Sequence, residues 1–147
     1  TKIESRCVPL QKFFAGPGCT VRLADEILTA LHFPIPPDSF VGGFRKFGPR
    51  PALEIAVAAV GIAGERNGKS LTNARVAFGA VAPTPIRGSA TESVIEGKPL
   101  NEATIAAAVE TASNEISPIT DLRASEWYRR HLVRALTEEL LSHAVKH

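Results

Sequence analysis

The sequence predicts an α+β fold in which a β-rich first part precedes a helical second part. Three observations carry this prediction. Apolar and polar residues alternate with a period of two in several segments before residue 82, the apolar spacing becomes helical after residue 88, and strands do not alternate with helices along the chain. With 147 residues, of which 44% are apolar, the chain is long enough for one domain with a core or for two small ones.

The first 40 residues predict short extended segments joined by turns. Residues 2–8 are expected to form a short strand, and residues 9–20 a turn or a short helical hook that ends at Gly16-Pro17-Gly18. Residues 26–33 alternate between two faces and predict another strand, which the prolines that follow it bring to an end.

Three further strands are expected between residues 39 and 81. The first, 39–48, is interrupted by two glycines. The second, 52–64, fits a buried strand or a buried helix by its apolar run, and its β-branched residues favour a strand. Asn67-Gly68 predicts a hairpin between it and the third strand, 71–81. The proline-stiffened bend at 82–87 would then lead into the helical layer, with Arg87 expected to stay solvated and an acidic partner as the alternative.

Three helices are expected after this bend. A short one covers residues 89–97 and stops at Gly97. Asn101 is a good N-cap for the second, which ends before Pro118, and Ser125 is the N-cap of a long third helix. The predicted buried stripes are Ile105, Ala108, Val109, Ala112 and Ile116 on the second helix, and Tyr128, Leu132, Ala135, Leu136 and Leu140 on the third. Residues expected to face water or a partner on the third helix are Arg129, Arg130, Arg134, Glu138 and Glu139.

Composition excludes several classes of protein. The net charge of +2 is small and the basic residues are interleaved with acids, so nucleic acid is not an expected partner. No apolar run approaches the length of a membrane span, and no signal peptide is recognisable. Cys7 and Cys19 show no metal-binding spacing and are expected to be reduced, packed thiols, which favours a cytoplasmic protein. The chain begins at Thr1 and contains no methionine, which indicates a piece of a longer polypeptide.

No self-contained active site is recognisable from the residues, and no catalytic residue is predicted. The glycine-rich stretches at 15–18 and 41–44 match no phosphate-binding motif, so turns and a bulge are the expected interpretation. Phe44, Lys46 and Arg50 place an aromatic ring and two cations beside a Gly/Pro bend. Such a group can hold an anionic, planar ligand, although the residues alone favour a surface salt-bridge cluster.

Three blocks in order resemble a known family. "FRKFGPRPALEIAVAAVGI", "NARVAFGAVAPTPIRGSATESVIEGKPLNEATI" and "SPITDLRASEWYRRHLVRAL" are similar to the C-terminal portion of the FAD-binding (medium) subunit of the molybdenum hydroxylases, which include carbon monoxide dehydrogenase and xanthine dehydrogenase. The resemblance implies that residues 1–39 end the second FAD-binding subdomain, a mixed α+β unit. Residues 40–147 would form the C-terminal domain, a three-stranded antiparallel sheet packed with a three-helix bundle.

The resemblance also implies an oxidoreductase subunit with FAD as its cofactor. In such enzymes electrons pass from a molybdenum cofactor through iron–sulfur clusters to FAD and on to an acceptor. The implied partners are therefore the iron–sulfur small subunit and the molybdopterin large subunit, and a homodimer is a further possibility. The family's main pyrophosphate-binding segments have no counterpart in this chain, so the isolated piece is expected to be inactive and to bind FAD weakly.

The family motif of an aromatic residue, Lys and Arg falls on Phe44, Lys46 and Arg50. By the same resemblance Ile55 lies near the isoalloxazine ring, and Thr72 matches a further position near the flavin. Phe44 replaces the usual Tyr and Glu54 the usual Asp. The alternative function is a docking module without a cofactor, in which Trp127, Tyr128, Arg129, Arg130 and Arg134 anchor the other subunits.

Overall fold

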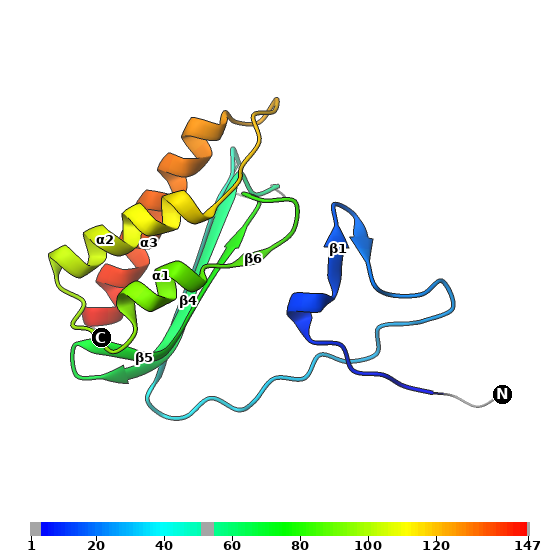
Figure 1. The fold of residues 1–147 in the computed structure, drawn as a ribbon, viewed down its shortest axis with the longest axis horizontal. Helices are drawn as coiled ribbons and strands as arrows, with labels where there is room; N and C mark the ends of the chain where they lie inside the picture. The colour runs from blue at the N-terminus through cyan, green and yellow to red at the C-terminus, as the bar shows by residue number, and fades with distance from the viewer. Residues whose placement is uncertain (1–3, 51–54, 147) are drawn as a thin grey trace.

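A computed structural model describes residues 4–50 and 55–146 of the chain. Two parts are distinguished in Figure 1. The N-terminal arm, residues 4–39, consists largely of irregular segments. The sheet–helix unit, residues 40–146, contains the main sheet and three helices. The α+β class predicted from the sequence is confirmed, since the strands precede the helices along the chain.

The arm has little regular structure. A 3-10 helix, η1 (Leu10–Lys12), confirms the expected hook, and it leads into a hairpin of β1 (Phe14–Gly16) and β2 (Cys19–Thr20). The strand predicted at 26–33 is wrong, and the described part of 2–8, from residue 4 onward, is not a strand either. Alternation alone does not make a strand, because the backbone N–H and C=O groups need a neighbouring strand. The described residues provide none beside these two segments.

An ion pair ties these two irregular segments of the arm together instead. Arg6 Nε donates to Glu26 Oε1 at 2.6 Å, and Arg6 Nη2 donates to the second oxygen at 2.7 Å. These bonds and the Leu23 N–H lower the pKa of Glu26 to about 2. Cys7 and Cys19 are free thiols and both are exposed, so the expectation that they are packed is wrong.

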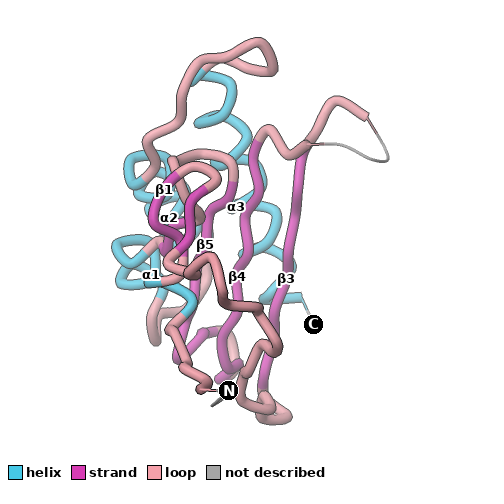
Figure 2. The backbone as a smooth tube through the Cα atoms, turned by 90° about the vertical axis from the view of Figure 1, so that its right-hand side faces the viewer, coloured by secondary structure: helices cyan, strands magenta, loops and turns pink. Residues whose placement is uncertain are grey.

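The main sheet contains the three predicted strands, but the second begins later than predicted: residues 55–57 are not part of it, and 52–54 lie outside the described residues. The three strands are β3 (Phe40–Phe47), β4 (Ala58–Asn67) and β5 (Ser70–Gly79), and the two-residue β6 (Ile86–Arg87) adds a fourth after the proline-rich bend. The order is β3-β4-β5-β6, and every pairing is antiparallel. The predicted β4–β5 hairpin is confirmed, with Asn67 paired to Ser70 and Gly68 at a positive φ of 60°. The three long strands lie side by side in Figure 2.

The three predicted helices are α1 (Ser89–Ile95), α2 (Glu102–Glu115) and α3 (Glu126–Lys146). Both predicted N-caps are confirmed. The Asn101 side chain accepts a hydrogen bond from the Thr104 N–H at 2.9 Å, and Ser125 Oγ accepts one from the Tyr128 N–H at 3.2 Å.

The buried stripes are correct for α2 and partly wrong for α3. On α2, residues 108, 109 and 112 are buried, as is Ile116 at its end, and Ile105 is half-buried. On α3, Leu132 and Leu140 are buried as predicted, but Ala135 is exposed. The inner face also includes Val133 and Leu141, because α3 crosses a twisted sheet and its buried side shifts around the axis along its length.

The core lies between the three helices and one face of the sheet (Figure 1). Its largest fully buried side chains are Phe78, Leu71, Ile95, Ile116 and Leu141. Among the described residues, no α-helix covers the opposite face, which is turned toward the arm (Figures 1 and 2). We call it the open face. Within the described residues, no helix combines the length and the apolar character needed to cross a bilayer.

Candidate functional site

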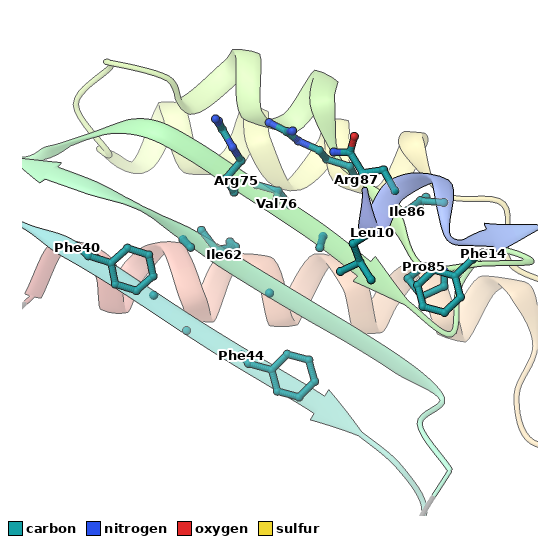
Figure 3. Close-up of a pocket in the computed structure, with 16 residues that line it drawn as sticks. Leu10, Phe14, Phe40, Phe44, Ile62, Arg75, Val76, Pro85, Ile86 and Arg87 are labelled. Carbon is teal, nitrogen blue, oxygen red and sulfur yellow. The ribbon is translucent and has the colours of Figure 1, made fainter. Parts of the chain in front are cut away.

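A groove of about 640 Å³ runs over the open face. Small residues of the three long strands form its floor, and aromatic and basic side chains form its walls (Figure 3). The arm contributes Leu10 and Phe14. The floor residues are Gly42, Gly61, Ala63 and Ala77, and the main wall residues are Phe40, Phe44, Arg75 and Arg87.

Strand alternation explains why the groove is flat. Along β3, residues 41, 43, 45 and 47 point to the helices, whereas 40, 42, 44 and 46 point to the open face. A Cβ on Gly42 would lie 3.2 Å from the Phe40 ring, so the absence of a side chain lets this ring lie close to the strand. A flat apolar floor with aromatic walls suits a planar, largely apolar ligand or an apolar protein surface.

Arg87 is held by an acid at the edge of the groove. Its Nε and Nη2 each donate to a Glu92 carboxylate oxygen at 2.8 Å, and the same carboxylate accepts the Val76 N–H at 2.8 Å. Burial acts to raise the pKa of Glu92, but these bonds outweigh it and hold the pKa below its ordinary value. The alternative expectation, an acidic partner for Arg87, is confirmed, because Glu92 in the first turn of α1 lies directly against it, although the Arg87 side chain remains 39% exposed.

Four of the five predicted site residues lie at or beyond the C-terminal half of β3. Phe44 is 63% exposed and forms part of the groove wall. Lys46 is exposed and points to the same face, two residues further along. Arg50 follows the end of the strand, also exposed, and Ile55 is 62% exposed just before β4. Glu54, the predicted departure from the family pattern, lies outside the described residues.

A backbone hydrogen bond brings the chain after Ile55 back to the end of β3. The Val57 N–H donates to the Phe47 carbonyl at 2.7 Å. Lys46 and Ile55 are therefore each within two residues of this bond, on opposite sides of it. The structure thus brings the cation and the exposed apolar residue to the same end of the sheet.

Thr72 lies apart from this group. It pairs with Glu65, which pairs with Phe40 at the start of β3. Six residues of extended chain separate Phe40 from Lys46, a distance of roughly 20 Å. The Thr72 hydroxyl donates to the Glu65 carbonyl at 3.3 Å. Thr72 therefore does not share a single small site with Lys46 and Ile55.

The sequence interpretation missed the groove itself. Its walls include Phe40 and Arg75, and its floor comes from small residues on different strands. A signal was present in the sequence, because Gly61 and Ala63 occupy alternate positions of β4 and Ala77 occupies the matching face of β5. Without the strand register, however, these residues cannot be assigned to one surface.

Residues 43–144 match a family described as the CO dehydrogenase flavoprotein C-terminal domain. The chain belongs to this family. The match covers the sheet–helix unit almost entirely, and it confirms the family expected from the three sequence blocks. The fold expected from the family is confirmed as well, with β6 as a small addition to its sheet.

Relatives of known name agree with this assignment. The chain is 36% identical over 141 residues to a xanthine dehydrogenase FAD-binding subunit of Escherichia coli O157:H7, covering 95% of this chain and 48% of the relative. It is 32% identical over 133 residues to the glyceraldehyde dehydrogenase medium chain of Sulfolobus acidocaldarius, covering 90% and 47%. The chain thus spans about half the length of the curated relatives it matches.

Solved structures show the same fold. A chain of carbon monoxide dehydrogenase from Hydrogenophaga pseudoflava superimposes with a TM-score of 0.89 at 24% identity, covering 95% of this chain and 48% of that one. A chain of quinoline 2-oxidoreductase from Pseudomonas putida 86 gives a TM-score of 0.86 at 26% identity, covering 96% and 48%. Both matches include the arm as well as the sheet–helix unit.

Proposed function

We propose that this chain is the C-terminal part of the FAD-binding subunit of a molybdenum hydroxylase. In the complete enzyme, electrons would pass from iron–sulfur clusters to FAD and then to an acceptor. The observation that carries the proposal is the exposed group at the end of β3. There Phe44, Lys46 and Ile55 lie at one end of the sheet in a chain whose relatives include a FAD-binding subunit.

The chemistry of these residues suits a flavin. FAD, when bound, supplies the redox chemistry, and the protein positions its ring and adjusts the local charge. Lys46 and Arg50 would place positive charge beside the ring, which favours added electron density on it. Ile55 and Phe44 would pack against the apolar part of the ring. Thr72 is roughly 20 Å of strand away and does not contact the same ring.

The phosphate groups of FAD need other contacts. A pyrophosphate is held by several backbone N–H groups at helix N-termini or in anion-binding loops. We place these contacts in the half of the subunit that this chain does not span. We assign residues 1–39 to the end of the second FAD-binding subdomain and residues 40–147 to the C-terminal domain. In support of this division, none of residues 4–39 is buried in the structure.

The assembly and location follow from the same proposal. An iron–sulfur small subunit and a molybdopterin large subunit are the proposed partners, because two relatives are named as a subunit and as a medium chain. We place the enzyme in the cytoplasm. Two unpaired thiols in the arm are compatible with a reducing compartment.

The test uses the full-length subunit purified with and without added FAD. The unmodified protein should show the visible flavin absorbance, and Lys46→Ala and Ile55→Ala should each weaken FAD binding by about tenfold, the effect of losing one good contact. Lys98→Ala is the matched control, because Lys98 is exposed in the turn before α2, far along the chain from β3. A full-length subunit that takes up no FAD would contradict the proposal.

A docking role is the second candidate function. Ile119, Leu122 and Trp127 are strongly exposed around the start of α3, and the Trp127 ring stacks on His131 at 5.6 Å. Exposed aromatic and aliphatic residues of this kind are typical of interface anchors. The arginines contribute less than expected to this surface, because Arg130 binds Glu126 and Arg134 binds Glu110.

Trp127→Ala in the full-length subunit separates the two functions. If this surface docks the other subunits, the variant should lose co-purification with them while it keeps its flavin absorbance. Glu138→Ala is the control, because Glu138 is an exposed residue further along the same helix. Unchanged co-purification would exclude docking through Trp127.

A further inference from the structure

Arg129 is a buried charge that the flavin contacts named above do not use. Its exposed fraction is only 4%, although the helical pattern predicted it on the outer face of α3. Burying a guanidinium is costly unless its N–H groups find partners. The expectation that Arg129 faces water or a partner protein is therefore wrong. Its hydrogen-bond acceptors show which parts of the chain it holds together.

Three separate segments converge on the Arg129 side chain. Its Nη1 donates to the Val57 carbonyl at 2.6 Å and to the Ala80 carbonyl at 2.8 Å. Its Nη2 donates to Asp121 Oδ1 at 2.8 Å. The guanidinium thus joins the entry to β4, the chain after β5 and the segment before α3.

Val57 is the contact that connects Arg129 with the proposed site. Its carbonyl accepts from Arg129, and its N–H donates to the Phe47 carbonyl at the end of β3. The Phe47 and Tyr128 rings meet edge to face, with their centroids 6.0 Å apart. The first turn of α3 therefore also packs against the end of β3. The peptide groups on both sides of Val57 are therefore fixed, one by Arg129 of α3 and the other by the end of β3.

The residues proposed to touch the flavin lie next to this arrangement along the chain. Lys46 directly precedes Phe47, and Ile55 lies two residues before Val57. Their separation depends on how the start of β4 is held against the end of β3. Arg129 contacts the start of β4 at the Val57 carbonyl and is itself buried.

We propose that Arg129 is a positioning residue that sets the spacing of Lys46 and Ile55 at the flavin ring. This rests on the proposed function. It predicts that a change at Arg129 alters flavin binding through the Val57 carbonyl. A purely structural role predicts a different result, in which the whole sheet–helix unit is destabilised and flavin binding by the folded fraction is unchanged.

The experiment compares Arg129→Lys with Arg130→Met in the full-length subunit. Lysine keeps the charge but cannot donate to Val57, Ala80 and Asp121 in the same planar arrangement. Arg130 is the next residue on α3 and binds Glu126, so its replacement controls for the loss of an arginine on this helix. Three quantities are measured: hydrogen exchange at the Val57 and Leu141 amides without FAD, the dissociation constant of FAD, and the flavin reduction potential.

In Arg129→Lys, exchange at Val57 should rise at least tenfold while exchange at Leu141 in the core of α3 stays within twofold. The FAD dissociation constant should rise by about tenfold, the effect of losing one or two charge-assisted hydrogen bonds, and the reduction potential should shift. Arg130→Met should leave all three quantities unchanged. Equal effects of the two substitutions, or equal increases in exchange at Val57 and Leu141, would overturn the proposal.

The outcomes separate this inference from the function on which it rests. A wild-type subunit that binds no FAD contradicts the proposed function, while exchange at Val57 still decides whether Arg129 holds the β4 entry. Wild-type binding that Arg129→Lys leaves unaltered overturns the inference alone. If Arg129→Lys does not fold, Asp121→Asn replaces it. That variant removes the negative charge that faces Arg129 Nη2 but leaves an amide oxygen that can still accept its hydrogen bond. The same increases are therefore expected but smaller, at about threefold.

Discussion

The arm and the sheet–helix unit differ in how much of their apolar surface they bury. Every residue classed as buried among the described ones lies between Val57 and Leu141, whereas the arm exposes six large apolar side chains between residues 23 and 35. Burying such side chains is the main favourable contribution to folding. The core of the described residues therefore lies within the sheet–helix unit, and the arm adds no buried side chain to it.

Replacing a large aromatic residue in each region gives the largest expected effect. Phe78→Ala removes a ring that is 1% exposed and should lower the free energy of unfolding by about 3–5 kcal/mol. Phe33→Ala removes a ring that is 81% exposed and should change it by less than about 0.5 kcal/mol. Urea denaturation followed by circular dichroism checks both values. Similar losses in the two variants would show that the arm is part of the same cooperative core.

Replacing a glycine in each region should show the same difference in stability, with smaller effects. A Cβ on Gly88 would lie 2.6 Å from the buried Phe78 ring, so Gly88→Ala should cost about 1–3 kcal/mol of unfolding free energy. A Cβ on Gly16 in β1 of the arm meets nothing within 4 Å, and Gly16→Ala should be nearly neutral. The thermal midpoints of the two variants measure the difference. A neutral Gly88→Ala would mean that the Phe78 ring moves aside at little cost.

Breaking an ion pair should also lower the free energy of unfolding more in the sheet–helix unit than in the arm. Arg87→Met leaves the 8%-exposed Glu92 without its partner and should cost about 1–2 kcal/mol, less than for a fully buried pair because Arg87 itself is 39% exposed. Arg6→Met breaks the exposed pair with Glu26 and should leave the global unfolding transition unchanged. Chemical denaturation at neutral pH compares the two. A loss in Arg6→Met equal to that in Arg87→Met would show that the arm and the unit unfold together.

The sequence predicted the sheet–helix unit better than the arm. In the sheet–helix unit, period-two and helical patterns, the Asn67-Gly68 turn and the two N-caps led to the correct strands and helices, because the partners that satisfy each pattern lie within the chain. In the arm, residues 26–33 carry an equally clear alternation, yet no strand forms there. Local pattern predicts which face is apolar but not whether a pairing edge is present.

The candidate site was partly predictable for a related reason. Phe44 and Lys46 alternate within one strand, so their common face follows from sequence spacing. The groove floor requires the register of three strands, and the burial of Arg129 requires three carbonyl or carboxylate oxygens from distant segments to meet it. Such convergence leaves no signal in the local sequence, because an arginine on a helix is exposed in most proteins.

The smallest expected effect concerns two carboxylates that titrate alike in the two regions. Hydrogen bonds from Arg129 to Asp121, and from Arg6 to Glu26, lower the pKa of each carboxylate to about 2. A carboxylate whose pKa is lower in the folded state stabilises that state above its unfolded pKa, and this contribution disappears as the pH falls through the folded pKa.

The stability gap between wild type and Asp121→Asn should therefore be present at about pH 5 and should close between about pH 4 and pH 2. Glu26→Gln should show no gap at either pH, because the arm contributes no buried side chain to the transition that circular dichroism detects. Urea denaturation of both variants across this pH range makes the measurement, and a gap for Glu26→Gln that closes in the same window would require the arm to unfold in one step with the sheet–helix unit.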